Sequence, residues 1–280
     1  MKTSMAVLQY FSEVIRKELG IVYLEANYYQ LETRLGEVAQ LNNCKSIDEL
    51  YQLMLRGLSP VALRQLFDIA TNNETYFYRD PSLFEAIDAT ILAEQKPNGQ
   101  LFKVWSAACS FGQEIYSLAM LFESKAAKLP NGYGILATDV SRRAVTTAAT
   151  GIYNDLQVQR GLSPALLSRF FTKVNPSEPS SDWQVRPELK RRVRFQEQNL
   201  LASFESLGKF HLILCRNVLI YQSVERKREI LSRLYRQLEP HGYLILGSSE
   251  SLIGLSDDFE MIRTDKAVLY RAIAKLAQTG

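Results

Sequence analysis

The stretch VWSAACSFGQEIYSLAMLF, residues 104–122, decides the fold of this 280-residue chain. It reads as an apolar strand, a turn of small residues and the start of a helix whose buried stripe is Ile115, Leu118, Ala119 and Phe122. A strand that enters a helix through a short loop is the unit of a doubly wound α/β sheet, whose ligands lie beyond the carboxyl ends of the strands. This loop is therefore the first candidate for a binding site.

The rest of the chain places this unit in the second of two parts. Residues 5–70 keep a helical period of apolar positions, which indicates a small helical bundle. After residue 71, short apolar strands alternate with amphipathic helices, and FEMIRTDKAVLYRAIA (259–274) holds two apolar runs around a polar turn. The pattern predicts an α/β fold with a doubly wound, mostly parallel sheet that ends in an antiparallel hairpin, as in seven-stranded Rossmann-like methyltransferases.

The composition changes along the chain predict the domain boundaries. We expect an N-terminal all-α helical domain at 1–70, a linker at 71–82 and a sheet domain at 83–280. A stretch rich in Ser, Pro and Arg predicts a small inserted subdomain at about 156–194, with a long loop as the alternative. Residues 160–194 hold eight Lys or Arg against three Asp or Glu, so an acidic partner is expected there if anywhere.

The overall composition excludes several classes of protein. A net charge of +3 is too small to argue for nucleic acid. No apolar run approaches the roughly 20 residues that cross a bilayer, and polar residues interrupt the N-terminus too early for a signal peptide. The cysteines Cys44, Cys109 and Cys215 have no metal-ligand spacing, so we expect no metal site and a reduced, cytoplasmic protein.

The residues of the first loop disfavour a phosphate ligand. A phosphate loop needs several glycines and a lysine, whereas residues 104–122 contain one glycine and no lysine, and Glu114 would repel a phosphate. A ligand with a cationic amino group and no phosphate fits better, and S-adenosylmethionine is such a ligand; a junction without ligand is the alternative. Ser110-x-x-Gln113 fits a capping box, so we expect the helix to begin around Phe111.

Further polar residues follow the predicted strands. Asp139 ends the second strand, where a carboxylate can accept hydrogen bonds from both hydroxyls of a ribose; capping of the next helix is the alternative. QNLL (198–201) and CRNVLIY (215–221) also stand at strand ends. In the second of these, Arg216 and Asn217 either bind a ligand or form a salt bridge and an Asn-stabilised turn.

Six motifs together carry a family resemblance. In their order along residues 71–250 they resemble the chemotaxis-receptor glutamate O-methyltransferases, the CheR family. The motifs with the most specific patterns are N-x-T-x-F-[FY]-R and C-R-N-V-x-I-Y. The six are TNNETYFYRDP (71–81), WSAACSFGQEIYSLA (105–119), ATDVSRRAVTTAATGIY (137–153), QNLL (198–201), FHLILCRNVLIY (210–221) and LEPHGYLILGSSE (238–250).

The resemblance implies an enzyme that moves a methyl group from S-adenosylmethionine to glutamate side chains of chemoreceptors and releases S-adenosylhomocysteine. It implies a monomer whose partners are receptor methylation helices, and it allows other chemosensory proteins as partners. Arg79 and Tyr221 would lie near the transferring methyl and the incoming carboxylate, Glu114 near the cofactor's ammonium and Asp139 near its ribose. The resemblance also implies that the linker at 71–82 contributes to the active site. The residues implied to contact the cofactor are Asn73, Thr75, Arg79, Ala108, Glu114, Asp139, Asn199, Leu200, Arg216 and Asn217.

Two alternatives to this function remain open. The chain could be an adaptor that binds S-adenosylmethionine and signals by protein contact, or a methyltransferase for a substrate other than a receptor.

A glutamate carboxylate, with a pKa of about 4.3, is ionised at neutral pH and needs no general base. Arg79 can orient such an anion, or it can form a surface ion pair with Asp80; Tyr221 can offer its hydroxyl, or it can be core packing. His211 starts an apolar strand, where we expect a hydrogen-bonded core histidine, so the sequence shows no histidine partner that would make Cys109 or Cys215 a nucleophile.

The sequence departs from the family pattern in two places that concern substrate docking. The second predicted helix offers Arg34 but carries Gly36 and Glu37 where the family often has further basic residues. The insert, FFTKVNPSEPSSDWQVRPELKRR (170–192), has none of the glycine found in members that dock on a receptor's C-terminal peptide. We therefore expect recognition to depend on the methylation helices themselves.

Overall fold

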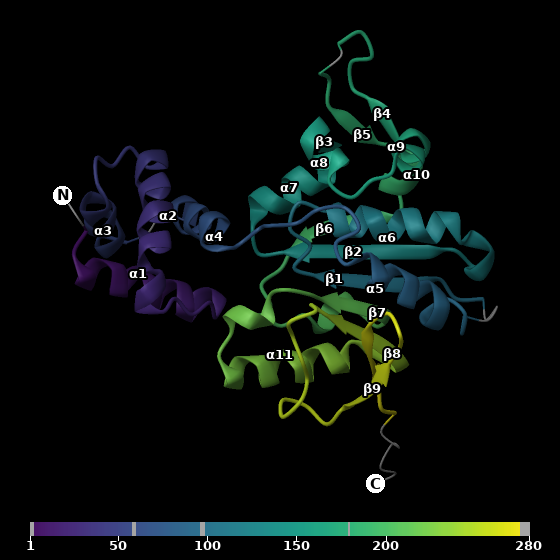
Figure 1. Ribbon diagram of the computed structural model, residues 1–280. Coiled ribbons are helices and arrows are strands. Elements are labelled where there is room, and N and C mark those ends of the chain that lie inside the picture. Colours follow the sequence, from purple (N-terminus) through teal and green to yellow (C-terminus); the bar gives the residue numbers. More distant parts are fainter. Residues whose placement is uncertain (1–2, 58–59, 96–98, 179, 275–280) are drawn as a thin grey trace.

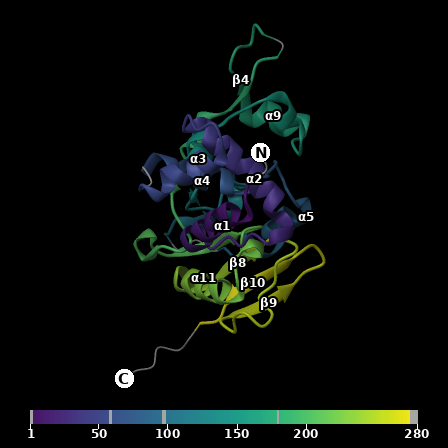
Figure 2. The same cartoon turned by 90° about the vertical axis from the view of Figure 1, so that its left-hand side faces the viewer.

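The N-terminal part of the chain folds as a helical bundle. The structure is a computed structural model that describes residues 3–57, 60–95, 99–178 and 180–274. Four helices, α1 (Met5–Leu19), α2 (Tyr28–Leu41), α3 (Ile47–Leu55) and α4 (Pro60–Ala70), stand together at one side of the sheet (Figures 1 and 2). Their apolar faces bury a common core, so the predicted all-α domain is confirmed. The largest fully buried residues of this core are Phe11, Ile15, Leu31, Leu35 and Leu50.

A seven-stranded sheet forms the second part, in the order β6-β2-β1-β7-β8-β10-β9. The first five strands of this order pair in parallel, and β10 pairs antiparallel with both β8 and β9. The prediction of a mostly parallel sheet closed by a hairpin is therefore confirmed. The strands are β1 (Phe102–Ala107), β2 (Tyr133–Asp139), β6 (Val193–Glu197), β7 (Phe210–Cys215), β8 (Leu238–Leu246), β9 (Phe259–Arg263) and β10 (Val268–Ala272).

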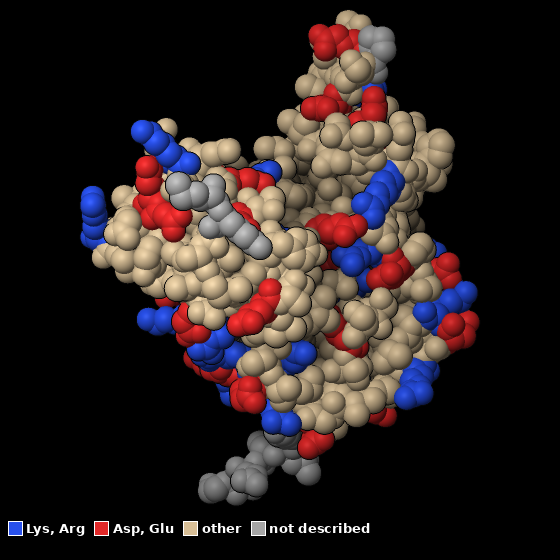
Figure 3. Space-filling model, turned by 60° about the vertical axis from the view of Figure 1, so that its left-hand side comes forward, with Lys and Arg blue, Asp and Glu red and all other residues tan. Residues whose placement is uncertain are grey.

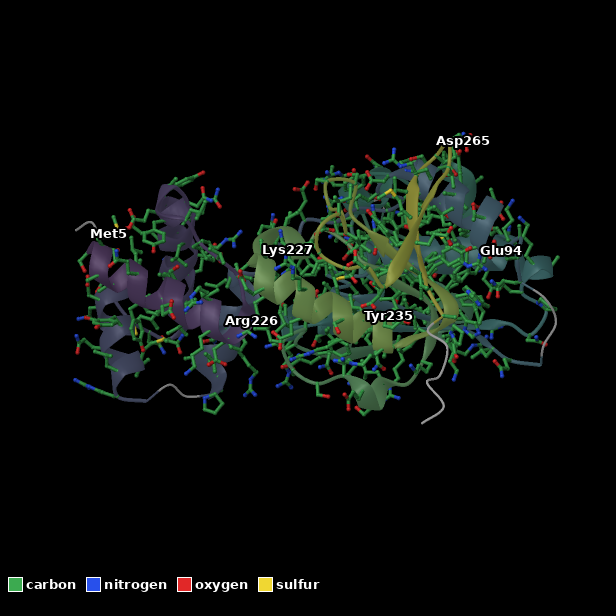
Figure 4. All side chains as sticks on the ribbon, turned by 90° about the horizontal axis from the view of Figure 1, so that it is seen from below. Met5, Glu94, Arg226, Lys227, Tyr235 and Asp265 are labelled. Carbon is green, nitrogen blue, oxygen red and sulfur yellow. The ribbon has the colours of Figure 1, made fainter. Side chains whose placement is uncertain are left out.

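Helices cover both faces of this sheet. Successive side chains of a strand point to opposite faces of the sheet. Val104 therefore packs in the core with α5 (Pro81–Ala86) and α6 (Gln113–Ser124), whereas Trp105 packs in the core on the other face with α11 (Val224–Arg236). Seen from below, α11 runs from Arg226 near the helical domain to Tyr235 beneath the last strands (Figure 4). With both faces buried, polar groups reach solvent mainly at the strand ends.

The inserted subdomain projects from the large sheet (Figure 1). It follows α7 (Arg142–Thr150) and contains a small antiparallel sheet in the order β3-β5-β4. This sheet also uses residues ahead of Leu156, because β3 pairs Tyr153 with Trp183. Its elements are β3 (Ile152–Tyr153), α8 (Asp155–Gln159), α9 (Pro164–Phe170), β4 (Phe171–Lys173), β5 (Trp183–Val185) and α10 (Pro187–Lys190).

None of the helices in the described ranges has the length and apolarity needed to cross a membrane. The same residues contain no group of three His, Cys, Asp or Glu side chains that could hold a metal ion.

Candidate functional site

A pocket lies at the carboxyl ends of β1, β2 and β7, where it also meets the helical domain. The space-filling view shows the surface hollowed between the helical domain and the projecting insert (Figure 3). Leu19 and Ile21 of the helical domain form part of its wall. All of the residues predicted to serve the site line this pocket: Asn73, Thr75, Arg79, Ala108, Glu114, Asp139, Asn199, Leu200, Arg216, Asn217 and Tyr221.

The loop after β1 has a conformation that the sequence did not predict. Helix α6 begins at Gln113 rather than near Phe111, and its N-cap is Gly112 with φ 87° and no side-chain hydrogen bond. The predicted capping box is therefore wrong. The Ser110 hydroxyl instead donates to the carbonyl of Asn73 at 2.9 Å, which ties the loop to the linker.

Small residues matter in this loop because its backbone adopts left-handed angles. Ala108 has φ 88° and Ser110 has φ 51°, a region that residues with large or branched side chains avoid. The N–H groups of Ala108 and Cys109 both donate to the carbonyl of Thr138 at 2.8 Å. The loop is thus fastened to the end of β2, and its small side chains leave room for a ligand beside the backbone.

Asp139 is a buried carboxylate held by this loop. Its Oδ2 accepts a hydrogen bond from the Ser110 N–H and its Oδ1 one from the Ser141 N–H, both at 2.9 Å. Burial raises the pKa of Asp139, and the backbone hydrogen bonds oppose that rise. The alternative role, capping of α7, belongs to the Ser141 hydroxyl, which accepts from the Ala144 N–H. Asp139 therefore presents a carboxylate with unused acceptor capacity to the pocket.

A cluster of charged side chains centred on Arg216 also lies at this pocket. The Arg216 side chain is 2% exposed and pairs with Glu114 through one amino group and with Asp80 through the other. Two carboxylates against one guanidinium leave the cluster with a net negative charge, which suits a cationic ligand. Arg216 Nε is buried and has no hydrogen-bond partner, so it could still donate to an anionic group in the pocket.

Arg79 and Tyr221 both line this pocket, and the side chain of each makes a hydrogen bond with the linker. Arg79 Nη1 donates to the carbonyl of Glu74 at 3.0 Å, and the predicted alternative, a pair with Asp80, is not formed because Asp80 contacts Arg216. The Tyr221 hydroxyl accepts from Asn72 Nδ2 at 3.0 Å and is therefore not core packing. Its own hydrogen remains available to a group in the pocket.

The helical domain contacts the site directly, which no sequence signal indicated. The Val22 N–H donates to the carbonyl of Tyr221 at 3.0 Å, and Asn199 Nδ2 donates to the carbonyl of Glu18 at 2.8 Å. Ile21 forms an isolated antiparallel bridge with Gln222. These contacts join segments that are about 200 positions apart in the sequence, and residues of both domains line the pocket.

Several basic side chains of residues 160–194 make contacts within the protein. Lys190 donates to the carbonyl of Thr150 at 2.8 Å, and Arg192 approaches Glu123 at 3.5 Å. Arg160 pairs with Glu74 of the linker at 3.1 Å. On the face shown in Figure 3, acidic and basic side chains are interspersed rather than gathered into one basic field.

Comparison with known proteins gives a consistent result over nearly the whole chain. Residues 6–71 match the family described as the all-alpha domain of CheR methyltransferases, and residues 73–268 match its SAM-binding domain.

Three curated relatives illustrate the similarity. Chemotaxis protein methyltransferase 1 of Pseudomonas aeruginosa is 40% identical over 97% of this chain and 100% of its own length. Chemotaxis protein methyltransferase Cher2 of Pseudomonas putida is 38% identical over 97% and 100%. The chemotaxis protein methyltransferase of Vibrio anguillarum is 36% identical over 93% and 94%. The chain therefore belongs to the CheR methyltransferase family, with an all-α domain followed by a domain that binds S-adenosylmethionine.

Proposed function

We propose that this chain methylates glutamate side chains of chemoreceptors, with S-adenosylmethionine as the methyl donor. The observation that carries the proposal is the placement of Arg79 and Tyr221, two groups suited to a carboxylate, at the pocket that also contains Asp139 and the acidic cluster around Arg216. We further propose that the enzyme acts as a cytoplasmic monomer on the receptors' methylation helices.

The pocket residues fit each part of the cofactor. Asp139 would accept hydrogen bonds from the ribose hydroxyls, because its buried carboxylate faces the pocket. Glu114 would attract the ammonium group, and the unpaired Nε of Arg216 would donate to the cofactor's carboxylate. The backbone at Ala108 leaves space for the ligand. We propose that the remaining lining residues complete the binding site: Asn73, Thr75, Asn199, Leu200 and Asn217.

The protein's task in catalysis is positioning. When bound, the cofactor supplies an electrophilic methyl group, and attack by a carboxylate oxygen forms the ester bond while the carbon–sulfur pair of electrons stays on sulfur. Arg79 would hold the incoming carboxylate by its planar guanidinium, and Tyr221 would donate its hydroxyl hydrogen to that anion. No described side chain has to remove a proton, because the glutamate is already ionised at neutral pH.

Transfer of labelled methyl from S-adenosylmethionine to a receptor fragment tests the function. We expect base-labile label on the fragment, as for a carboxyl ester, and loss of that label when the fragment's methylatable glutamates are replaced by alanine. Label that resists base, or that appears on a small molecule or RNA but not on the receptor, would favour the alternative of another substrate. Cofactor binding without transfer to any substrate would favour the adaptor.

Asp139→Ala should weaken binding of S-adenosylhomocysteine by about 1.5–3 kcal/mol, the cost of losing charge-assisted hydrogen bonds. The parent's affinity should also fall on acidification, because the ionised carboxylate is the better acceptor and burial raises the pKa of Asp139 above that of an ordinary aspartate. The loss should therefore begin at a higher pH than for an exposed aspartate, and Asp139→Ala should lack it. Titration calorimetry measures both effects.

Exposed Asp257 provides the control for this prediction. Asp257→Ala should keep the parent's affinity and its pH dependence. Equal affinities of Asp139→Ala and the parent would remove Asp139 from the ribose site.

The cysteines should be dispensable. Cys109 and Cys215 are buried, and burial raises the pKa of both thiols well above the usual value, so neither is a thiolate at neutral pH. Cys109→Ala and Cys215→Ala should retain most of the parent's methyl transfer when measured alongside thermal melts. A large rate loss without loss of thermal stability would point to a role for the thiol.

A further inference from the structure

Glu250, the last residue of the motif LEPHGYLILGSSE, binds the backbone of the segment that supplies Arg216, Asn217 and Tyr221. One oxygen, Oε2, accepts from the N–H groups of Asn217 and Gly247, each at 2.7 Å. The other oxygen, Oε1, accepts from the N–H groups of Val218 and Ile220, each at 3.1 Å. A single carboxylate thus satisfies four backbone donors, three of them within the segment 217–220.

No strand or α-helix holds this segment, which leads from the end of β7 into a single 3₁₀ turn. Asn217 has φ 57°, a left-handed conformation that is costly for most side chains and persists when its surroundings hold it. It separates the end of β7 from the short turn Leu219–Tyr221. The carboxylate of Glu250 fixes the segment on both sides of that residue, so the directions of the Asn217 and Tyr221 side chains depend on it.

The surrounding sequence permits the close approach. Gly247 lies where a Cβ atom would stand 2.6 Å from Asn217 Nδ2 and 2.9 Å from both the Asn217 backbone nitrogen and the Glu250 carboxylate, so any larger residue would displace these groups. Glycine at this position lets the β8 end, the Glu250 side chain and the site segment pack together. The arrangement joins the end of β8 to the site although Glu250 itself is not among the residues that line the pocket.

We infer that Glu250 is a positioning residue for methyl transfer: it sets the geometry of Asn217 toward the cofactor and of Tyr221 toward the incoming carboxylate. The inference rests on the proposed function, because it assigns those two residues to the reaction. An orienting role agrees with the charge: each oxygen accepts two hydrogen bonds, which a carboxylate can do at both positions. A glutamine has one acceptor oxygen, so its NH₂ group would face two N–H donors.

The test compares Glu250→Gln with Glu260→Gln, a matched change at an exposed carboxylate on β9. We expect Glu250→Gln to lower kcat for receptor methylation about tenfold or more, the effect of slightly misplaced reacting groups, and to raise the Kd for S-adenosylhomocysteine severalfold. Glu260→Gln should retain both values. Activity is measured at a temperature where thermal melts show every variant folded.

Combination with Tyr221→Phe distinguishes positioning from a general loss of stability. If Glu250 acts through Tyr221, Glu250→Gln should lower kcat much less in the Tyr221→Phe background than in the parent, because the hydroxyl it positions is already gone. Multiplied losses in the double variant, or a parent-like kcat and Kd for Glu250→Gln, would overturn the inference.

The outcomes also separate this inference from the proposed function. A parent-like rate for Tyr221→Phe removes Tyr221 from the mechanism and so contradicts the proposed function at that residue. The calorimetric Kd still tests Glu250 in that case, because its effect on Asn217 needs no receptor: an unchanged Kd overturns the inference, and a raised Kd retains it for the cofactor side alone.

Discussion

Arg216→Ala is expected to lower the free energy of unfolding by about 3–5 kcal/mol, the usual effect of removing one partner of a buried ion pair. The guanidinium is 2% exposed and is paired with both Glu114 and Asp80. Without it, Glu114, whose side chain is only 11% exposed, keeps a buried charge that forms no other ion pair within the described part of the chain. Asp80 is 34% exposed and can gain water, so the loss should fall toward the lower end of this range. Urea unfolding measures the effect.

The exposed pair Arg226–Glu229 provides the control for this prediction. Its side chains are 47% and 39% exposed, so Arg226→Ala should change the free energy of unfolding by about 1 kcal/mol or less. The double variant Arg216→Ala, Glu114→Gln should recover part of the stability, because it removes the unpaired charge. Equal stability of Arg216→Ala and the parent would show that the cluster is not a buried, coupled group.

Cofactor binding by the same variants separates the two roles of the cluster. If the net negative charge attracts the cofactor's ammonium, Glu114→Gln should weaken the binding of S-adenosylhomocysteine, although Arg216 still has Asp80 as an ion-pair partner in this variant. A structural role alone would lower stability without changing the affinity of the folded protein.

The sheet could be predicted from sequence because its signal is local. Val104, Ile213 and Leu244 each belong to a short apolar run, and such runs alternate with helices whose apolar positions keep a helical period. The same reasoning predicted that Asp139, Asn199, Arg216 and Asn217 meet at the pocket, since polar side chains at the carboxyl ends of parallel strands converge at one edge. Other site residues, among them Arg79 and Tyr221, were indicated only by the family resemblance. The cofactor roles of those residues remain predictions.

The partners of these residues could not be predicted, because they are distant in sequence. Arg216 pairs with Glu114 and Asp80, which stand 102 and 136 positions earlier. The sequence suggested an ion pair between Asp80 and Arg79 instead, because the two residues are neighbours. The hydrogen bond from the Asn199 side chain to the Glu18 carbonyl likewise results from packing between the two domains, and such packing has no periodic pattern in the sequence.

Local backbone chemistry misled the prediction at one position. Ser110-x-x-Gln113 has the residues of a capping box, yet Ser110 adopts φ 51° and its N–H donates to Asp139. The tertiary contact with the end of β2 outweighs the local capping preference, and the helix begins after Gly112. A capping motif beside a binding loop is thus ambiguous, since the same hydroxyl and N–H can serve the loop.

Tyr221→Phe is expected to lower kcat about a hundredfold, a loss of the size that misplacement of reacting groups causes. Asn72 occupies an acceptor position of the Tyr221 oxygen at 3.0 Å, so the hydroxyl hydrogen points away from Asn72 and can reach the incoming carboxylate. Arg79→Ala should lower kcat by about 10²–10³, because the guanidinium charge that balances and orients the anion is lost. Both residues are only partly buried, so thermal melts should stay near the parent's.

The ratio of the two kinetic constants distinguishes chemistry from docking in these variants. A hydroxyl that acts on the carboxylate during transfer should affect kcat more than the KM for receptor, whereas a residue that only docks the receptor helix should do the reverse. Asn72→Ala is the informative companion: it frees the Tyr221 hydroxyl without removing it, so it should fall between the parent and Tyr221→Phe. Calorimetry with S-adenosylhomocysteine should find near-parent affinity for Tyr221→Phe. Parent-like kcat in both Tyr221→Phe and Arg79→Ala, on a receptor fragment whose methylated glutamates are known, would mean that other groups at this pocket position the substrate.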